Sequence, residues 1–197
     1  VNNMKIATNS VNGTLLMPGE EFSYNKAIGE TTPENGYQQA GAYVAGEVVQ
    51  EYGGGVCNIS TILYRAAMRA NLKSSLRYNH SMMVSYAEPS LDATVYEGEI
   101  DYRFVNTYDF PIYIEGYMTS NTIVFNIYGN KESFGNNTYE LVNEVIEKLD
   151  YTTEYVNDNT LAEGSRVTTV NGMAGYRSKA YLVTYSNGVE VSREFIS

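Results

Sequence analysis

The residues best suited to chemistry in this 197-residue chain are its single cysteine and its single histidine. Cys57 directly follows Gly53, Gly54 and Gly55 and stands at the start of a run with helical spacing. A thiolate in the first turn of a helix is stabilised by the unpaired N–H groups and by the positive end of the helix dipole. The glycines let the backbone approach a substrate and offer N–H groups to an oxyanion. Cys57 is therefore a candidate nucleophile behind a candidate oxyanion and substrate loop; the competing interpretation is a small buried thiol under a turn.

The run after Cys57 predicts the helix that would hold it. Between residue 57 and about residue 70, apolar side chains recur at the spacing of one helix face, and Asn71 is a suitable stop signal. These apolar residues are Ile59, Ile62, Leu63, Ala66, Ala67 and Ala70. A loop, then the cysteine, then a helix is how many thiol enzymes hold their nucleophile.

His80 lies in a run, residues 76–86, that alternates like a half-buried strand. Every second residue in it is bulky or apolar, and His80 shares that parity. We therefore expect its ring to face the covered side, where the Cys57 helix would pack. The alternative is a core histidine whose nitrogens are satisfied locally. One cysteine and one histidine on suitable elements favour a catalytic pair.

A carboxylate is needed to fix the tautomer of such a histidine. Asp92 begins the next strand-like run and is the first choice, and Asp101 is the second. The competing interpretation is that either residue serves only as a turn or cap residue. Because one His and one Cys provide no clustered ligand set, we expect no metal and no cofactor.

Charge and hydropathy narrow the class of partner. The net charge of −10 and pI of about 4.6 argue against nucleic acid, whose phosphates require basic clusters. The apolar runs are too short to span a bilayer, and no signal-peptide pattern stands at Val1. We expect a piece of a longer exported or anchored protein, with membrane contact only through segments outside these residues.

The organisation of the chain predicts an α+β domain at residues 1–131 and a small all-β domain at residues 132–197. A polar joint rich in Gly and Asn, residues 129–137, separates them. In the first domain we expect the nucleophile helix to pack on an antiparallel sheet, as in cysteine enzymes. Strand-like runs stand at 110–118, 122–129, 139–146, 151–156, 180–185 and 189–195, and Asn187-Gly188 predicts a hairpin between the last two.

Ordered motifs over residues 1–131 resemble the VanW-domain family. They are Pro18–Asn25, Glu34–Tyr37, Gly53–Tyr64, Tyr78–Ser81 and Asp92–Val95.

The chain departs from the family pattern at two positions. Asn58 stands where the family usually has glutamine, and Ser90 where it usually has glycine. Asn58 keeps an amide in place, whereas Ser90 could alter the turn that delivers Asp92.

The resemblance implies an extracytoplasmic domain of the Gram-positive cell envelope. Some VanW domains are understood to be L,D-transpeptidases that cross-link peptidoglycan stem peptides through a catalytic cysteine, and Cys57 matches that position. The resemblance thus implies a cysteine-dependent acyltransferase. The residues themselves leave two alternatives open: a thiol peptidase or amidase on wall peptides, and a non-catalytic wall-binding protein.

The C-terminal region resembles the G-five domain, a small β module of cell-wall enzymes and adhesins. The match rests on Leu161–Gly164, Asn171–Gly175 and Tyr185–Glu194. In that family the module is proposed to bind wall glycan or to act as a spacer. We expect a spacer ahead of a glycan binder, and we expect all the chemistry before the joint.

Overall fold

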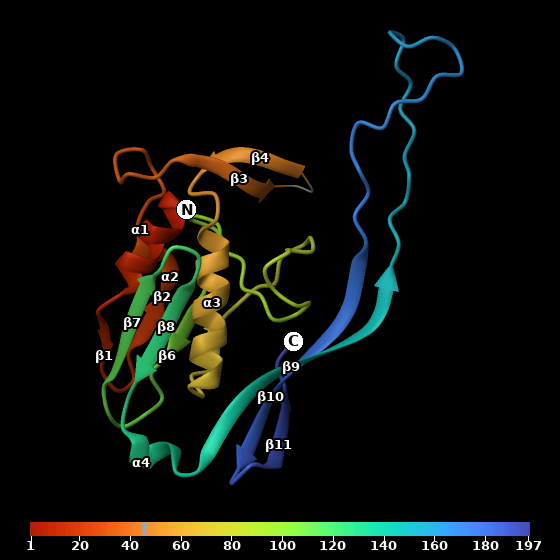
Figure 1. Ribbon diagram of the computed structural model, residues 1–197. Coiled ribbons are helices and arrows are strands. Elements are labelled where there is room, and N and C mark those ends of the chain that lie inside the picture. The colour runs from red at the N-terminus through yellow and green to blue at the C-terminus, as the bar shows by residue number, and fades with distance from the viewer. Residues whose placement is uncertain (45–46) are drawn as a thin grey trace.

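The computed structural model describes residues 1–44 and 47–197 of the chain. The chain forms an α+β body followed by an all-β region, and every described strand pair is antiparallel (Figure 1). The described helices are α1 (Asn2–Val11), α2 (Tyr24–Ile28), α3 (Val56–Arg69) and α4 (Lys131–Phe134).

The strands form separate small sheets. One has the order β1 (Thr14–Leu16), β7 (Ile112–Met118) and β8 (Ile123–Tyr128), and another the order β2 (Glu21–Ser23), β6 (Arg103–Val105) and β5 (Ser74–Leu76). β3 (Gln39–Val44) and β4 (Glu47–Tyr52) pair with each other, and the C-terminal sheet has the order β11 (Val189–Phe195), β10 (Gly175–Ser186) and β9 (Asn137–Leu149).

The helix predicted after the glycines is confirmed as α3, the central helix of the body. Its buried face, which includes Ile59, Leu63 and Ala67, follows the i, i+4 spacing. At its end Asn71 is left-handed with φ 55°, and the N–H of Leu72 donates to the carbonyl of Ala67 over 2.9 Å. This Schellman motif explains why the helix stops there.

The predicted strands near residues 110–129 and 180–195 are confirmed as β7, β8, β10 and β11. Asn187 and Gly188 have φ 50° and 81°, as a two-residue hairpin turn with a right-handed twist requires. The run at 139–146 lies in β9, but the strand predicted at 151–156 is wrong. There the chain has no regular structure, and Tyr155 and Val156 are exposed, so no partner supports a strand.

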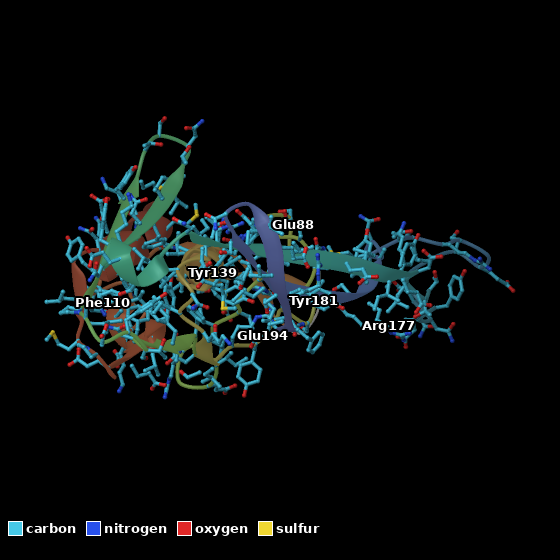
Figure 2. The ribbon with its side chains drawn as sticks, turned by 90° about the horizontal axis from the view of Figure 1, so that it is seen from below. Glu88, Phe110, Tyr139, Arg177, Tyr181 and Glu194 are labelled. Carbon is cyan, nitrogen blue, oxygen red and sulfur yellow. The ribbon has the colours of Figure 1, made fainter. Side chains whose placement is uncertain are left out.

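The C-terminal sheet is attached to the body near α3 before it extends away from it (Figure 1). Leu141, Ala180 and Leu182 belong to the same buried cluster as the apolar face of α3. Figure 2 shows Tyr139 among the side chains of the body and Arg177 further out along the sheet. The ion pair between Lys73 and Glu194, at 2.6 Å, adds a polar contact to this attachment. In the described part of the chain, every helix is too short or too polar to cross a membrane.

Candidate active site

The glycine loop places Cys57 in the first turn of α3. Gly55 is the N-cap residue with φ 99°, a left-handed conformation that favours glycine. Gly54 lies so close to β3 that an added Cβ would stand 2.5 Å from the carbonyl oxygen of Ala40. The loop therefore needs small residues for steric reasons as well as for any chemistry.

The N–H groups of this loop are not equally available. The N–H of Gly53 donates to Gln38 O over 3.4 Å, and that of Gly54 donates to Glu51 O over 3.3 Å. Among the described residues, no acceptor lies in hydrogen-bond geometry with the N–H of Gly55 or of Cys57. These two groups, rather than the whole loop, remain as candidate oxyanion donors.

The strand predicted for residues 76–86 is wrong beyond Leu76. β5 ends there, and the following segment wraps over the body with a single bridge between Tyr78 and Thr94. The N–H of His80 donates to the Asp92 carboxylate over 2.6 Å instead of to a strand partner. The Asp92 carboxylate thus accepts the hydrogen bond that the backbone of a neighbouring strand would otherwise accept.

His80 nonetheless lines the cavity together with Cys57 of α3, but strand parity is not the reason, because Tyr78, which shares that parity, is 52% exposed. Nδ1 of His80 lies 2.6 Å from Oδ2 of Asp92, and its Nε2 lies 3.2 Å from the hydroxyl of Tyr86. Burial lowers the pKa of His80, but hydrogen bonds to Asp92 and Cys57 raise it more, so that the pKa rises from 6.5 to about 9. The imidazolium form is therefore favoured beside the thiol and the carboxylate.

Asp92 is held from behind by Arg77. Nε of Arg77 donates to the Asp92 carbonyl over 2.7 Å, and Nη2 lies 3.5 Å from its carboxylate. Burial raises the pKa of Asp92, and the hydrogen bonds from His80 and the charge of Arg77 lower it further than burial raises it. The group facing His80 is thus a carboxylate in a fixed orientation.

Asp101 lies elsewhere, at the start of α2. Its carboxylate accepts hydrogen bonds from Ser23 Oγ at 2.7 Å, from Asn25 N at 2.9 Å and from Arg103 Nε at 2.7 Å. Its contacts are those of a capping residue. Of the two carboxylates considered from the sequence, only Asp92 contacts His80.

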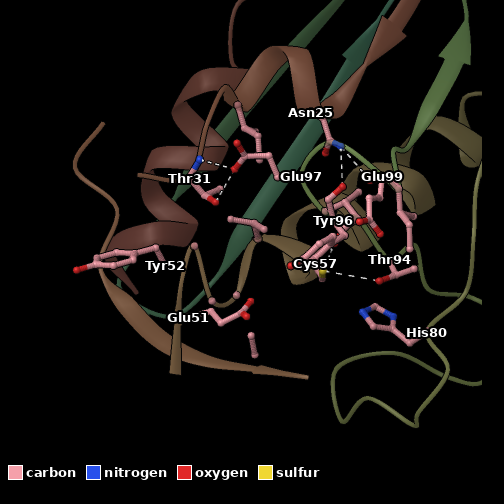
Figure 3. A pocket seen from close by; sticks show the side chains of 18 of the residues that line it. Asn25, Thr31, Glu51, Tyr52, Cys57, His80, Thr94, Tyr96, Glu97 and Glu99 are labelled. Carbon is pink, nitrogen blue, oxygen red and sulfur yellow. Dashed lines mark hydrogen bonds between the residues drawn. The ribbon is translucent and has the colours of Figure 1, made fainter. Parts of the chain in front are cut away.

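Cys57 and His80 both line a cavity of about 930 Å³ (Figure 3). Sγ of Cys57 lies 3.3 Å from the carbonyl of Val95, to which the thiol donates, and 3.9 Å from Oγ1 of Thr94. When the thiol ionises, it can no longer donate a hydrogen bond to the Val95 carbonyl. The Thr94 hydroxyl can then turn its hydrogen toward the negatively charged sulfur.

The charged side chains of this cavity are mainly acidic. Glu51, Glu97 and Glu99 line it, and Glu97 accepts from the N–H and the hydroxyl of Thr31, each at 2.9 Å (Figure 3). Among the described lining residues there is no Lys or Arg. A substrate group that carries positive charge suits such a wall.

Sequence reasoning gave no role to Tyr86, Thr94 or Arg77, although all three contact the proposed residues. Tyr86 and Arg77 stand in the same run as His80, and Thr94 stands in the Asp92–Val95 motif, so their positions were signals that could have drawn notice. No group of three or more His, Cys, Asp or Glu side chains that could hold a metal ion is found among the described residues.

Comparisons with known proteins agree with the two resemblances. The family described as VanW like protein matches residues 1–128, and the G5 domain matches residues 140–197. The chain is 34% identical over 128 residues to the uncharacterized protein YoaR of Bacillus subtilis (strain 168). The aligned region covers 65% of this chain and 42% of YoaR. The chain is also 26% identical over 136 residues to the vancomycin B-type resistance protein VanW of Enterococcus faecalis (strain ATCC 700802 / V583). That aligned region covers 66% of this chain and 49% of the relative. The chain thus spans less than half the length of these relatives, and no solved structure matches it.

Proposed function

This chain belongs to the family of VanW like proteins, with a G5 domain after the family region, and from that premise we propose that it is a cysteine-dependent peptidoglycan L,D-transpeptidase. The observation that carries the proposal is that Cys57 and His80 line one cavity and that Asp92, outside it, is hydrogen-bonded to His80. Its site of action is the cell envelope, in keeping with a G5 module and with a relative named for resistance to vancomycin.

The first half-reaction is acylation of the enzyme. The Cys57 thiolate attacks the carbonyl carbon that joins the third residue of a donor stem peptide to its terminal D-residue. The N–H groups of Gly55 and Cys57 stabilise the resulting oxyanion, a contribution of about 3–4 kcal/mol per donor in other enzymes. Protonated His80 gives its proton to the amine as the C–N bond breaks, which leaves a thioester and neutral His80.

The second half-reaction releases the product. The side-chain ammonium of a second stem peptide first releases one proton to solvent. Neutral His80 then takes a second proton from the amine as the amine attacks the thioester carbon. The C–S bond breaks, the thiolate returns, and the product is an amide between two third-position residues. His80 ends protonated, ready for the next donor.

Two features support this assignment of roles. Asp92 orients His80 through Nδ1, so that Nε2, which lies 3.2 Å from the Tyr86 hydroxyl, is the nitrogen that a substrate could engage by displacing this contact. The glutamates of the cavity wall favour an acceptor that arrives as an ammonium ion. That second feature favours amine transfer over hydrolysis, in which water would resolve the same thioester and the protein would be a carboxypeptidase.

Mass analysis of peptidoglycan fragments tests the proposal. Tetrapeptide muropeptides incubated with the protein should lose the terminal D-residue and form dimers joined through their third residues. The Cys57→Ala variant, which keeps the small apolar contact with the core, is the control and should form neither product. Shortened monomers without dimers would favour the hydrolase, and unchanged muropeptides would favour a non-catalytic wall-binding protein.

A further inference from the structure

The C-terminal sheet contacts the segment that carries Asp92. Oγ of Ser178, on β10, lies 2.6 Å from Oγ of Ser90. Oγ of Ser197 accepts a hydrogen bond from Nη1 of Arg77 over 2.7 Å. A groove of about 480 Å³ runs between the two parts and is lined both by residues 79–84 and by residues 175–178.

Ser90 occupies a position where its backbone conformation is costly. Its φ is 67°, in the left-handed region that glycine adopts without strain. The carbonyl of Ser90 accepts from Nη2 of Arg77 over 2.9 Å, and its hydroxyl meets Ser178. A glycine could adopt the turn more easily, but it could not make the contact with the C-terminal sheet.

Arg77 connects the same sheet to Asp92. Its side chain is 9% exposed, and its guanidinium lies 5.1 Å from the centre of the Tyr64 ring. One edge of the guanidinium contacts Ser90 and Asp92, and Nη1 contacts Ser197. Ser197 is in turn fixed to β10, because its carbonyl accepts from the N–H of Ala180 over 2.8 Å.

From these contacts we propose that the C-terminal domain positions the His80–Asp92 pair, with Ser178 and Ser197 as positioning residues for the transfer reaction proposed above. The domain is then part of the catalytic apparatus as well as a connection to the wall. Neither serine touches the cavity that holds Cys57, so both act through Ser90 and Arg77. The inference rests on the proposed function for its kinetic consequence, but its structural consequence can be measured without any substrate.

The test uses the Ser178→Ala/Ser197→Ala double variant of the full 197-residue chain. Ser192→Ala is the matched control, since Ser192 is exposed on the neighbouring strand β11 and has no side-chain hydrogen bond to a described residue. Because the chain has one histidine, the imidazole protons of His80 give one NMR titration curve. Cys57, Tyr86 and Asp92 face this ring, and Glu88 and Arg177 line the adjoining groove, so the titrations are compared at one ionic strength.

In the double variant we expect the His80 titration to move to lower pH by about half a unit or more, because a loosened carboxylate favours the imidazolium less. We also expect kcat to fall about 3- to 10-fold while KM stays within about twofold of the wild-type value. This pattern is typical of a change that affects the transition state more than substrate binding. The control should match the wild type, and Ser178→Thr, which keeps the hydroxyl, should retain the wild-type titration.

The positioning role is overturned if the folded double variant has the wild-type titration curve and the wild-type kcat. It is also overturned if Ser192→Ala moves the curve as far as the double variant does. A shifted titration together with a wild-type protein that leaves muropeptides unchanged would support the positioning role while refuting the transferase. The two proposals therefore fail separately.

Discussion

Replacing Asp92 with asparagine separates the charge of this residue from its shape. The amide keeps the size of the side chain and can still accept the backbone N–H of His80, but it no longer carries a charge facing Nδ1. We expect the His80 pKa, about 9 in the wild type, to fall toward 6.5 by about 1–2 pH units. The part of the His80 pKa that remains above 6.5 in the variant would be the contribution of Cys57.

The same change makes a prediction for stability. A rise in pKa from 6.5 to about 9 corresponds to about 3 kcal/mol in favour of the folded imidazolium. Since water reaches the cavity, we expect about 2 kcal/mol of this to be lost in the variant. A raised histidine pKa stabilises the fold fully below pH 6.5, and the contribution disappears as the pH rises through about 9. The variant should thus differ most from the wild type near pH 6, and the pH-dependent part of that difference should vanish near about pH 10.

Urea unfolding at about pH 6 and about pH 10, together with the NMR titration of His80, measures both effects. Asp101→Asn is the matched control, because that carboxylate caps α2 and does not contact His80. The reasoning is refuted if the Asp92→Asn variant titrates at the wild-type pH, or if its loss of stability is the same at both pH values. Equal titration shifts in the two variants would also refute it, since a general loss of negative charge would then explain them.

The remaining predictions concern single residues around the cavity. Alkylation of the full chain should label Cys57 alone. His80→Ala should lower the rate of transfer about 10²- to 10⁴-fold, whereas Asp92→Asn should lower it about 10- to 10²-fold. Equal losses in the two variants, measured by steady-state kinetics, would reject the orienting role of Asp92. Gly54→Ala should destabilise the protein by about 1–3 kcal/mol in urea unfolding, because its Cβ meets a backbone carbonyl of β3; an unchanged midpoint would show that β3 yields. Asp101→Asn should lower stability by about 1–3 kcal/mol and leave the turnover of the folded enzyme unchanged, and a kinetic defect without a stability defect would return Asp101 to the site.

Sequence patterns predicted the elements whose side chains pack in a regular period. Helix α3 was predictable because its apolar face and its terminal asparagine are local signals. The hairpin at Asn187-Gly188 was predictable because the turn requires residues that tolerate positive φ. Residue type and local pattern also singled out Cys57 and His80, which the structure brings to one cavity.

The path of the chain around His80 could not be predicted in the same way. Alternation in residues 76–86 predicts a strand, but the Asp92 carboxylate takes the N–H of His80, and only long-range folding brings that group near. The contacts of Ser178, on β10, and of Ser197, beyond β11, had no signal, because serines in such positions usually face solvent. The preference for Asp92 over Asp101 rested on its place at the start of a strand-like run. The structure has only isolated bridges there, and it distinguishes the two residues by the hydrogen bonds that each makes.

The solitary thiol at the wall of an open cavity has a consequence for oxidation. Cys57 is partly exposed, and within these 197 residues there is no second thiol that could resolve a sulfenic acid as an intramolecular disulfide. An oxidant that reaches the cavity would therefore leave a sulfenic acid that persists, proceeds to the irreversible sulfinic acid, or couples to a thiol of another molecule. Repair must come from an external reductant, so the lifetime of the reactive sulfur depends on the redox conditions of the compartment in which the protein works.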